Sequence, residues 1–101
     1  MRRVLLYART SAGDGNLDRQ FQALEASLEA GDQVDGSYAD WGPATADPPP
    51  GLVEALDHLA QGNVDALLVQ RLDRLARSPE ELERIQAMLQ DRGVTLVLAQ
   101  S

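Results

Sequence analysis

The chain has 101 residues, enough for one domain with a modest core, and 44% of them are hydrophobic. It has no cysteine, which excludes a disulfide framework and a thiolate metal site. The formal net charge is −7 and every basic residue is an arginine, so contact with nucleic acid requires a local arginine patch. No apolar run is long enough for a membrane span or a signal peptide, and we therefore expect a cytoplasmic protein.

The first half of the chain predicts a strand, a helix and a second strand. Residues 3–8 read as the first strand, and Asn16 is a candidate N-cap for a helix that ends at Gly31. One face of this helix is apolar and consists of Leu17, Phe21, Leu24 and Leu28. Residues 33–40 form a weaker strand, and residues 41–50 form a long loop rich in proline.

The second half repeats this alternation. A helix with Leu52, Ala55, Leu56 and Leu59 on one face ends at Gly62, and a strand follows over residues 64–70. Ser78 is then a strong N-cap, with Pro79 at the first helical position and Glu81 three residues after the cap. The buried stripe of this helix is predicted to be Leu82, Ile85, Met88 and Leu89. Gly93 ends the helix before a last strand over residues 94–98. The order βαβαβαβ predicts an α/β fold with a parallel sheet.

A first polar cluster follows the first strand. Tyr7, Arg9 and Ser11 alternate, so an extended backbone points all three side chains the same way. A serine hydroxyl beside an arginine can attack a phosphodiester, because the guanidinium neutralises the phosphate oxygens. A loop serine next to a surface arginine explains the same short pattern.

A second polar cluster follows the third strand. Arg71, Asp73, Arg74 and Arg77 lie within seven residues. Arginine binds phosphate in a bidentate manner, and Asp73 is suited to fix one guanidinium in place. A solvated loop with incidental ion pairs is the alternative interpretation.

Other residues are weaker candidates for chemistry. His58 is the single histidine, and we expect it at the surface of the second helix, which argues against a Ser-His-Asp hydrolase. No Gly-Lys-Ser/Thr follows Gly13 and Gly15, so they do not form a nucleotide-binding loop. The acidic residues show no metal-ligand spacing, and Trp41 is interpreted as a loop anchor.

Taken in order, these motifs resemble the N-terminal catalytic domain of serine site-specific recombinases, the resolvase/invertase family. Residues 7–11 are similar to the family's Tyr-x-Arg-x-Ser, and residues 17–20 resemble its Leu-Asp-x-Gln. Residues 71–77 match the Asp-Arg-Leu-x-Arg signature, and residues 50–52 are similar to the Gly-Leu that opens the second helix. The resemblance covers residues 1–101 as one domain.

The resemblance implies a three-layer α/β fold with sheet order 2-1-3-4 and helices on both faces, which brings the two clusters to one end of the sheet. It implies a DNA recombinase that works through a covalent phosphoserine intermediate, without a metal or other cofactor. Its partners would be DNA, in the context of a full-length protein, and a second copy in a homodimer. Ser11 would be the nucleophile, and the other catalytic residues would be Arg9, Gln20, Asp73, Arg74 and Arg77. Tyr7 and Arg71 are further candidates for phosphate contacts.

Two departures from the family pattern keep other interpretations open. Pro48, Pro49 and Pro50 stand where the family carries an arginine, and losing one such donor costs ~3 kcal/mol of transition-state stabilisation. The chain also lacks the long dimerisation helix and the DNA-binding domain of the family. The alternative is therefore a catalytically silent, recombinase-like module that binds a protein. A receiver-type phosphate-binding domain is disfavoured because no acidic pair follows the first strand and lysine is absent.

Overall fold

A parallel sheet of four strands is the middle layer of the computed structural model, which describes residues 2–10, 17–41, 50–71 and 78–99. The strands are β1 (Arg3–Thr10), β2 (Gln33–Trp41), β3 (Ala66–Val69) and β4 (Thr95–Leu98). Their order in the sheet is β2-β1-β3-β4, and all three neighbouring pairs are parallel. The predicted sheet order is confirmed.

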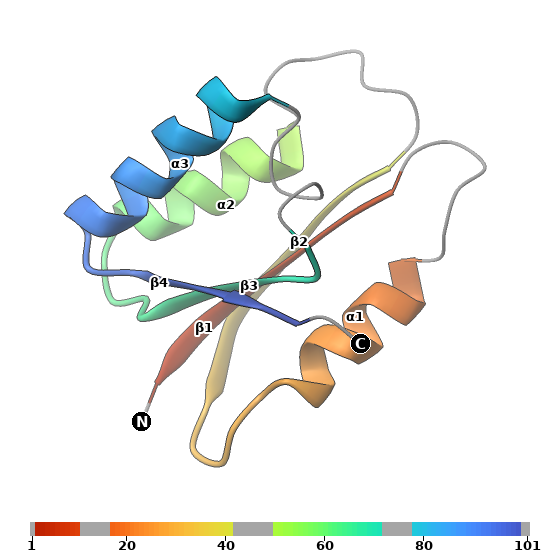
Figure 1. The fold of residues 1–101 in the computed structure, drawn as a ribbon. Helices are drawn as coiled ribbons and strands as arrows, with labels where there is room; N and C mark the ends of the chain where they lie inside the picture. The colour runs from red at the N-terminus through yellow and green to blue at the C-terminus, as the bar shows by residue number, and fades with distance from the viewer. Residues whose placement is uncertain (1, 11–16, 42–49, 72–77, 100–101) are drawn as a thin grey trace.

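Three helices cover the sheet on both faces (Figure 1). Helix α1 (Leu17–Ala26) lies on one face, while α2 (Pro50–Ala60) and α3 (Pro79–Asp91) lie together on the other. In such crossovers the helices run antiparallel to the strands. The first turns of α2 and α3 therefore lie at the carboxyl end of the sheet. The predicted three-layer architecture is confirmed.

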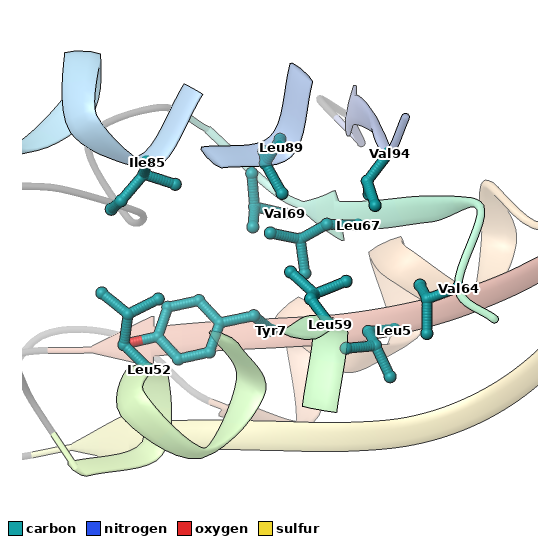
Figure 2. Packing of buried hydrophobic residues seen from close by; sticks show 10 residues of the cluster. All are labelled: Leu5, Tyr7, Leu52, Leu59, Val64, Leu67, Val69, Ile85, Leu89 and Val94. Carbon is teal, nitrogen blue, oxygen red and sulfur yellow. The ribbon is translucent and has the colours of Figure 1, made fainter. Parts of the chain in front are cut away.

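Side-chain alternation along β1 divides the core in two. Leu5 and Tyr7 pack with residues of α2, α3 and β3, and Figure 2 shows this cluster: Leu5, Tyr7, Leu52, Leu59, Val64, Leu67, Val69, Ile85, Leu89 and Val94. The opposite face of the sheet packs against α1 through Val4, Leu6, Ala8, Leu24, Ala66, Leu68 and Ala99. The strand period of two residues thus places apolar side chains on both faces of a central strand.

Several element boundaries differ from the sequence predictions, among them the start of β3, which begins at Ala66 instead of residue 64, and the ends of β1 and α1. Strand β1 extends to Thr10, two residues beyond the predicted end, because it stays paired with β2 as far as Trp41. Helix α1 ends at Ala26, well before Gly31. The next two amides, of Ser27 and Leu28, bond three residues back instead of four, and such a tightened turn ends an α-helix.

The buried stripe of α3 also differs from the prediction. Its buried residues are Glu81, Ile85 and Leu89, whereas Leu82 and Met88 are half-buried. A charged residue therefore occupies the first position of this stripe.

Among the described residues, no helix is both long enough and apolar enough to cross a membrane.

Candidate active site

The described residues include half of the predicted site. Tyr7, Arg9, Gln20 and Arg71 have described positions, and three of them lie close together; Arg71 is exposed just past the end of β3. The predicted nucleophile Ser11 lies outside the described residues. So do Asp73, Arg74 and Arg77 of the second cluster.

Gln20 fixes the backbone of Arg9. Its side-chain oxygen accepts a hydrogen bond from the Arg9 N–H at 3.1 Å, and its amide nitrogen donates to the Arg9 carbonyl at 2.8 Å. Strand β3 pairs with β1 only up to Leu6, so Arg9 has no strand partner on that side. The buried Gln20 side chain replaces that partner and links α1 to the end of β1. Two of the predicted site residues, Arg9 and Gln20, are thus in direct contact.

The Arg9 side chain is buried, with 8% of the residue exposed. Arg9 continues the alternation of Leu5 and Tyr7, so its side chain belongs to the face covered by α2 and α3. Its Nη1 atom has no hydrogen-bond partner among the described residues. A buried guanidinium nitrogen without a partner is a donor available to an anion.

Tyr7 is held by a carboxylate that the sequence analysis did not single out. Its hydroxyl donates to Asp40 Oδ2 at 2.7 Å. Burial of the ring is the largest cause that raises the pKa of Tyr7, followed by its hydrogen bond to Asp40. Tyr7 is therefore a neutral hydrogen-bond donor over the physiological pH range.

Asp40 also caps helix α2. Its two oxygens accept from the backbone N–H groups of Gly51 at 2.8 Å and Leu52 at 2.9 Å. Gly51 is required here, since a Cβ atom at this position would lie 2.4 Å from the Ala39 carbonyl oxygen. A groove of about 430 Å³ opens beside this cap and is lined by Ser37, Tyr38, Ala39, Asp40, Pro50, Gly51 and Glu54.

Helix α3 contributes a second carboxylate, Glu81. Ser78 is the N-cap, as predicted, and its Oγ accepts from the Glu81 N–H at 3.2 Å. Glu81 is buried, with 8% of the residue exposed, and its Oε1 atom has no partner among the described residues. The reciprocal bond of a capping box, from the Glu81 side chain to the Ser78 N–H, is absent from the hydrogen bonds between described residues.

Two acidic residues were therefore missed as parts of the site. Asp40 lies next to the end of β2 and eleven residues before Gly51, a signal for a cap that acts across a loop. Glu81 was interpreted only as a capping residue. In the part of the chain that the structure describes, no three His, Asp or Glu side chains are placed to share a metal ion.

The prediction that His58 is a surface residue is wrong. Its side chain is half-buried between α2 and β2, with both ring nitrogens in hydrogen-bond contact: Nδ1 with the Tyr38 hydroxyl at 2.7 Å and Nε2 with Asp35 at 2.7 Å. A register shift opposite Val4 and Leu5 lets Asp35 reach the ring, and Gly36 leaves room for it. The amphipathic pattern of α2 did not reveal this contact.

Comparison with protein families gives a match over almost the whole chain. Residues 4–101 match the family model described as the resolvase N-terminal domain. A resolvase of Escherichia coli is 30% identical over 94 residues, which cover 92% of this chain. The serine recombinase gin of Escherichia phage Mu is 37% identical over 93 residues, which cover 87% of this chain. In both cases the match covers 42% of the relative, so the chain spans less than half of these curated relatives.

Solved structures share the fold. The C-terminal catalytic domain of ISC1926 TnpA, an IS607-like serine recombinase, superposes with a TM-score of 0.84 at 26% identity, covering 98% of this chain and 70% of that one. The N-terminal catalytic domain of TP901-1 integrase also has a TM-score of 0.84, at 27% identity, covering 97% and 77% of the two chains.

Proposed function

We propose, since the chain belongs to the resolvase N-terminal domain family, that it is the catalytic domain of a DNA recombinase that acts through Ser11. The observation that carries the proposal is the family match over residues 4–101, which includes every residue of both polar clusters. The arrangement of Tyr7, Arg9 and Gln20 at the carboxyl end of β1 supports it.

The proposed reaction is a phosphoryl transfer in two steps. The Ser11 oxygen bonds to phosphorus as the bond from phosphorus to one DNA sugar oxygen breaks. The serine hydroxyl loses a proton and the departing sugar oxygen gains one, which gives a phosphoserine link and a free DNA hydroxyl. Attack by a DNA hydroxyl on the phosphoserine reverses these changes and restores Ser11. The number of phosphate ester bonds is conserved, so the exchange requires no external energy source.

The arginines stabilise the charge that develops on the phosphate. Arg9 is suited to this role because it is buried and because its backbone N–H and carbonyl are both hydrogen-bonded to the Gln20 side chain. A donor that is fixed before reaction costs little reorganisation in the transition state. We assign Arg74 and Arg77 the same role from the second cluster, with Asp73 orienting them. Arg71 and Tyr7 are assigned supporting contacts.

DNA is the proposed substrate, and affinity for it is assigned to parts of a longer protein. A net charge of −7 opposes binding of this domain to a polyanion by bulk electrostatics. We accordingly propose that this domain carries out the chemical step, whereas affinity for DNA comes from other parts of a longer protein or from a homodimer. The family carries an arginine where this chain has Pro48, Pro49 and Pro50. We therefore predict that the rate of the chemical step is lower by ~100-fold or more.

A covalent-trapping experiment tests the proposal. Residues 1–101 are joined to the remaining part of the phage Mu recombinase gin and incubated with a duplex carrying that recombinase's target sequence. We expect a protein–DNA adduct that survives denaturation, and mass spectrometry of the digest should place the nucleotide on Ser11. Ser11→Ala should abolish the adduct, because no other group is assigned the attack on phosphorus.

Ser37→Ala is the matched control, since Ser37 is exposed on β2 and, although it lines the groove beside the Asp40 cap, it is assigned no contact with the phosphate. It should form the adduct as the unaltered domain does. An adduct that persists in Ser11→Ala would refute the assignment of the nucleophile. A folded hybrid that gives no adduct would favour the catalytically silent, protein-binding module instead.

A further inference from the structure

Two buried ionisable side chains at one end of the sheet have atoms without a partner. They are Nη1 of Arg9 and Oε1 of Glu81, and each residue is only 8% exposed. No other buried side-chain nitrogen or oxygen among the described residues lacks a partner. Burying an unpaired charge is costly, so two such atoms of opposite charge require an explanation.

Arg9 and Glu81 extend the cluster of Figure 2 from two different elements, β1 and α3. Arg9 is two residues beyond Tyr7 on β1, and Glu81 is four residues before Ile85 on α3, so each lies one repeat beyond a core residue. Both repeats lead toward the carboxyl end of the sheet. Figure 2 shows this direction, from Val64 and Val94 at one end of the cluster to Tyr7 and Ile85 at the other.

The other carboxylate described at this end of the sheet already has partners. Asp40 pairs with Arg9 across β1 and β2, but its oxygens accept from the Tyr7 hydroxyl and from the first amides of α2. None of the ion pairs between described residues includes Arg9 or Glu81. Glu81 is therefore the buried carboxylate left to balance the Arg9 charge.

Tyr7 supports the closeness of the two charges. After burial and the bond to Asp40, which raise the pKa of Tyr7 most, the charge of Arg9 lowers it and the charge of Glu81 raises it. Both charges therefore act on the same phenol. Because the carboxylate of Glu81 does not close a capping box with Ser78, capping does not account for its burial.

We propose that Glu81 is a positioning residue, a buried counter-charge that acts through space on the Arg9 guanidinium at the carboxyl end of β1 when no phosphate is bound. This role rests on the proposed function, since it assigns a task to an arginine of the same site. Glu81 does not contact the reacting phosphorus. It competes with the phosphate for the charge of Arg9, and in the empty site it offsets part of that charge.

A double-mutant cycle on the 101-residue chain tests the coupling. The equilibrium constant of unfolding in urea is measured for wild type, Arg9→Gln, Glu81→Gln and the double variant. We expect the equilibrium constant of unfolding of the double variant to be at least about fivefold smaller than the two single effects together predict, because the double variant leaves neither charge without its counter-charge. Glu80→Gln, an exposed neighbour with the same change of charge, should combine additively with Arg9→Gln.

Binding of inorganic phosphate distinguishes positioning from a purely structural role. Titration followed by NMR should show that Glu81→Gln binds phosphate at least about threefold more tightly than Glu80→Gln does. The gain should disappear when Arg9 is also replaced by Gln. Glu81→Asp, which keeps the charge, should return phosphate affinity toward wild type, and it provides the comparison if Glu81→Gln does not fold.

Additive stabilities in the cycle, or equal phosphate affinities of Glu81→Gln and Glu80→Gln, would overturn the role of Glu81. Neither readout requires DNA cleavage. If coupling is found but the covalent adduct on Ser11 is not, the proposed function fails and the coupling between Glu81 and Arg9 stands. If the adduct forms and the coupling is absent, only the role of Glu81 fails.

Discussion

The two ends of the sheet treat their charges in opposite ways. At the amino end, Arg2 forms a bidentate pair with Asp32, at 3.0 and 2.7 Å, and Arg3 lies 3.4 Å from Asp35. At the carboxyl end, Arg9 and Glu81 are each only 8% exposed, yet each has an atom without a partner among the described residues. The charged side chains named at the amino end are in ion pairs, whereas those named at the carboxyl end keep atoms that, within the described part of the chain, are free to bind another group.

We interpret this difference as a contrast between an end that is stabilised by its own charge pairs and an end that is suited to bind an anion. Paired surface charges need no further group, so the amino end requires no ligand. Buried charged groups that lack hydrogen-bond partners are stabilised when an anion or a hydroxyl binds to them. Before binding, the surrounding structure has to keep them in position. Gln20 and Asp40 provide that support, by fixing the Arg9 backbone and the start of α2.

The largest expected effect comes from removing the support at Asp40. Asp40→Ala loses the cap of α2 and leaves the Tyr7 hydroxyl without an acceptor, so the free energy of unfolding should fall by about 3 kcal/mol. Urea unfolding measures it. Asp57→Ala, at an exposed position of the same helix, should change stability by less than about 0.5 kcal/mol. Equal effects of the two changes would contradict the supporting role of Asp40.

A smaller effect is expected from Tyr7→Phe, which removes one hydrogen bond and keeps the cap. We expect a loss of about 1 kcal/mol at neutral pH. The raised pKa of Tyr7 also has a signature in alkali. The unfolded chain releases this proton near pH 10 and the folded chain retains it, so stability is fully present below about pH 10 and falls above it.

Tyr7→Phe should therefore flatten the alkaline decline of stability, measured by urea unfolding between about pH 8 and pH 11. Tyr38→Phe is the matched tyrosine change, because Tyr38 contacts His58 outside the proposed site. If Tyr7→Phe kept the same alkaline slope as wild type, the burial of a neutral Tyr7 phenol would be contradicted.

The smallest expected effect concerns the amino end. The hydrogen bond from Arg2, followed by that from the Glu29 N–H, lowers the pKa of Asp32 below 3.8. Its contribution to stability is therefore present above about pH 4 and is lost as the pH falls through the lowered pKa. Asp32→Asn should reduce the acid dependence of unfolding, and Arg2→Gln should remove most of the same part. A steeper acid dependence in either variant would contradict the pairing.

Much of the fold follows from local sequence signals. Val4, Leu6, Leu67 and Val69 belong to apolar runs that are typical of buried strands, and Ser78 followed by Pro79 begins α3 as predicted. Periodicity is less informative about helix ends. Helix α1 ends at Ala26 because the following amides bond three residues back, a choice that no side-chain pattern announces.

The site was predictable where a motif carries it and not where long-range contacts build it. Arg9 and Gln20 could be identified from their motifs, although the bond from the Gln20 side chain to the Arg9 backbone depends on where β3 stops pairing with β1. Asp40, Glu81 and His58 were missed or misplaced. Their partners are far away in the chain or, for Glu81 Oε1, absent among the described residues.

The most direct test of the contrast between the two ends is a phosphate titration of the isotope-labelled chain, followed residue by residue by NMR. The account predicts saturable shifts centred on Arg9, Gln20 and Glu81 at the carboxyl end, with the signals of Arg2 and Asp32 unchanged. Shifts centred on Arg2, Arg3 and His58, with the carboxyl end silent, would contradict the assignment of the anion site to that end of the sheet.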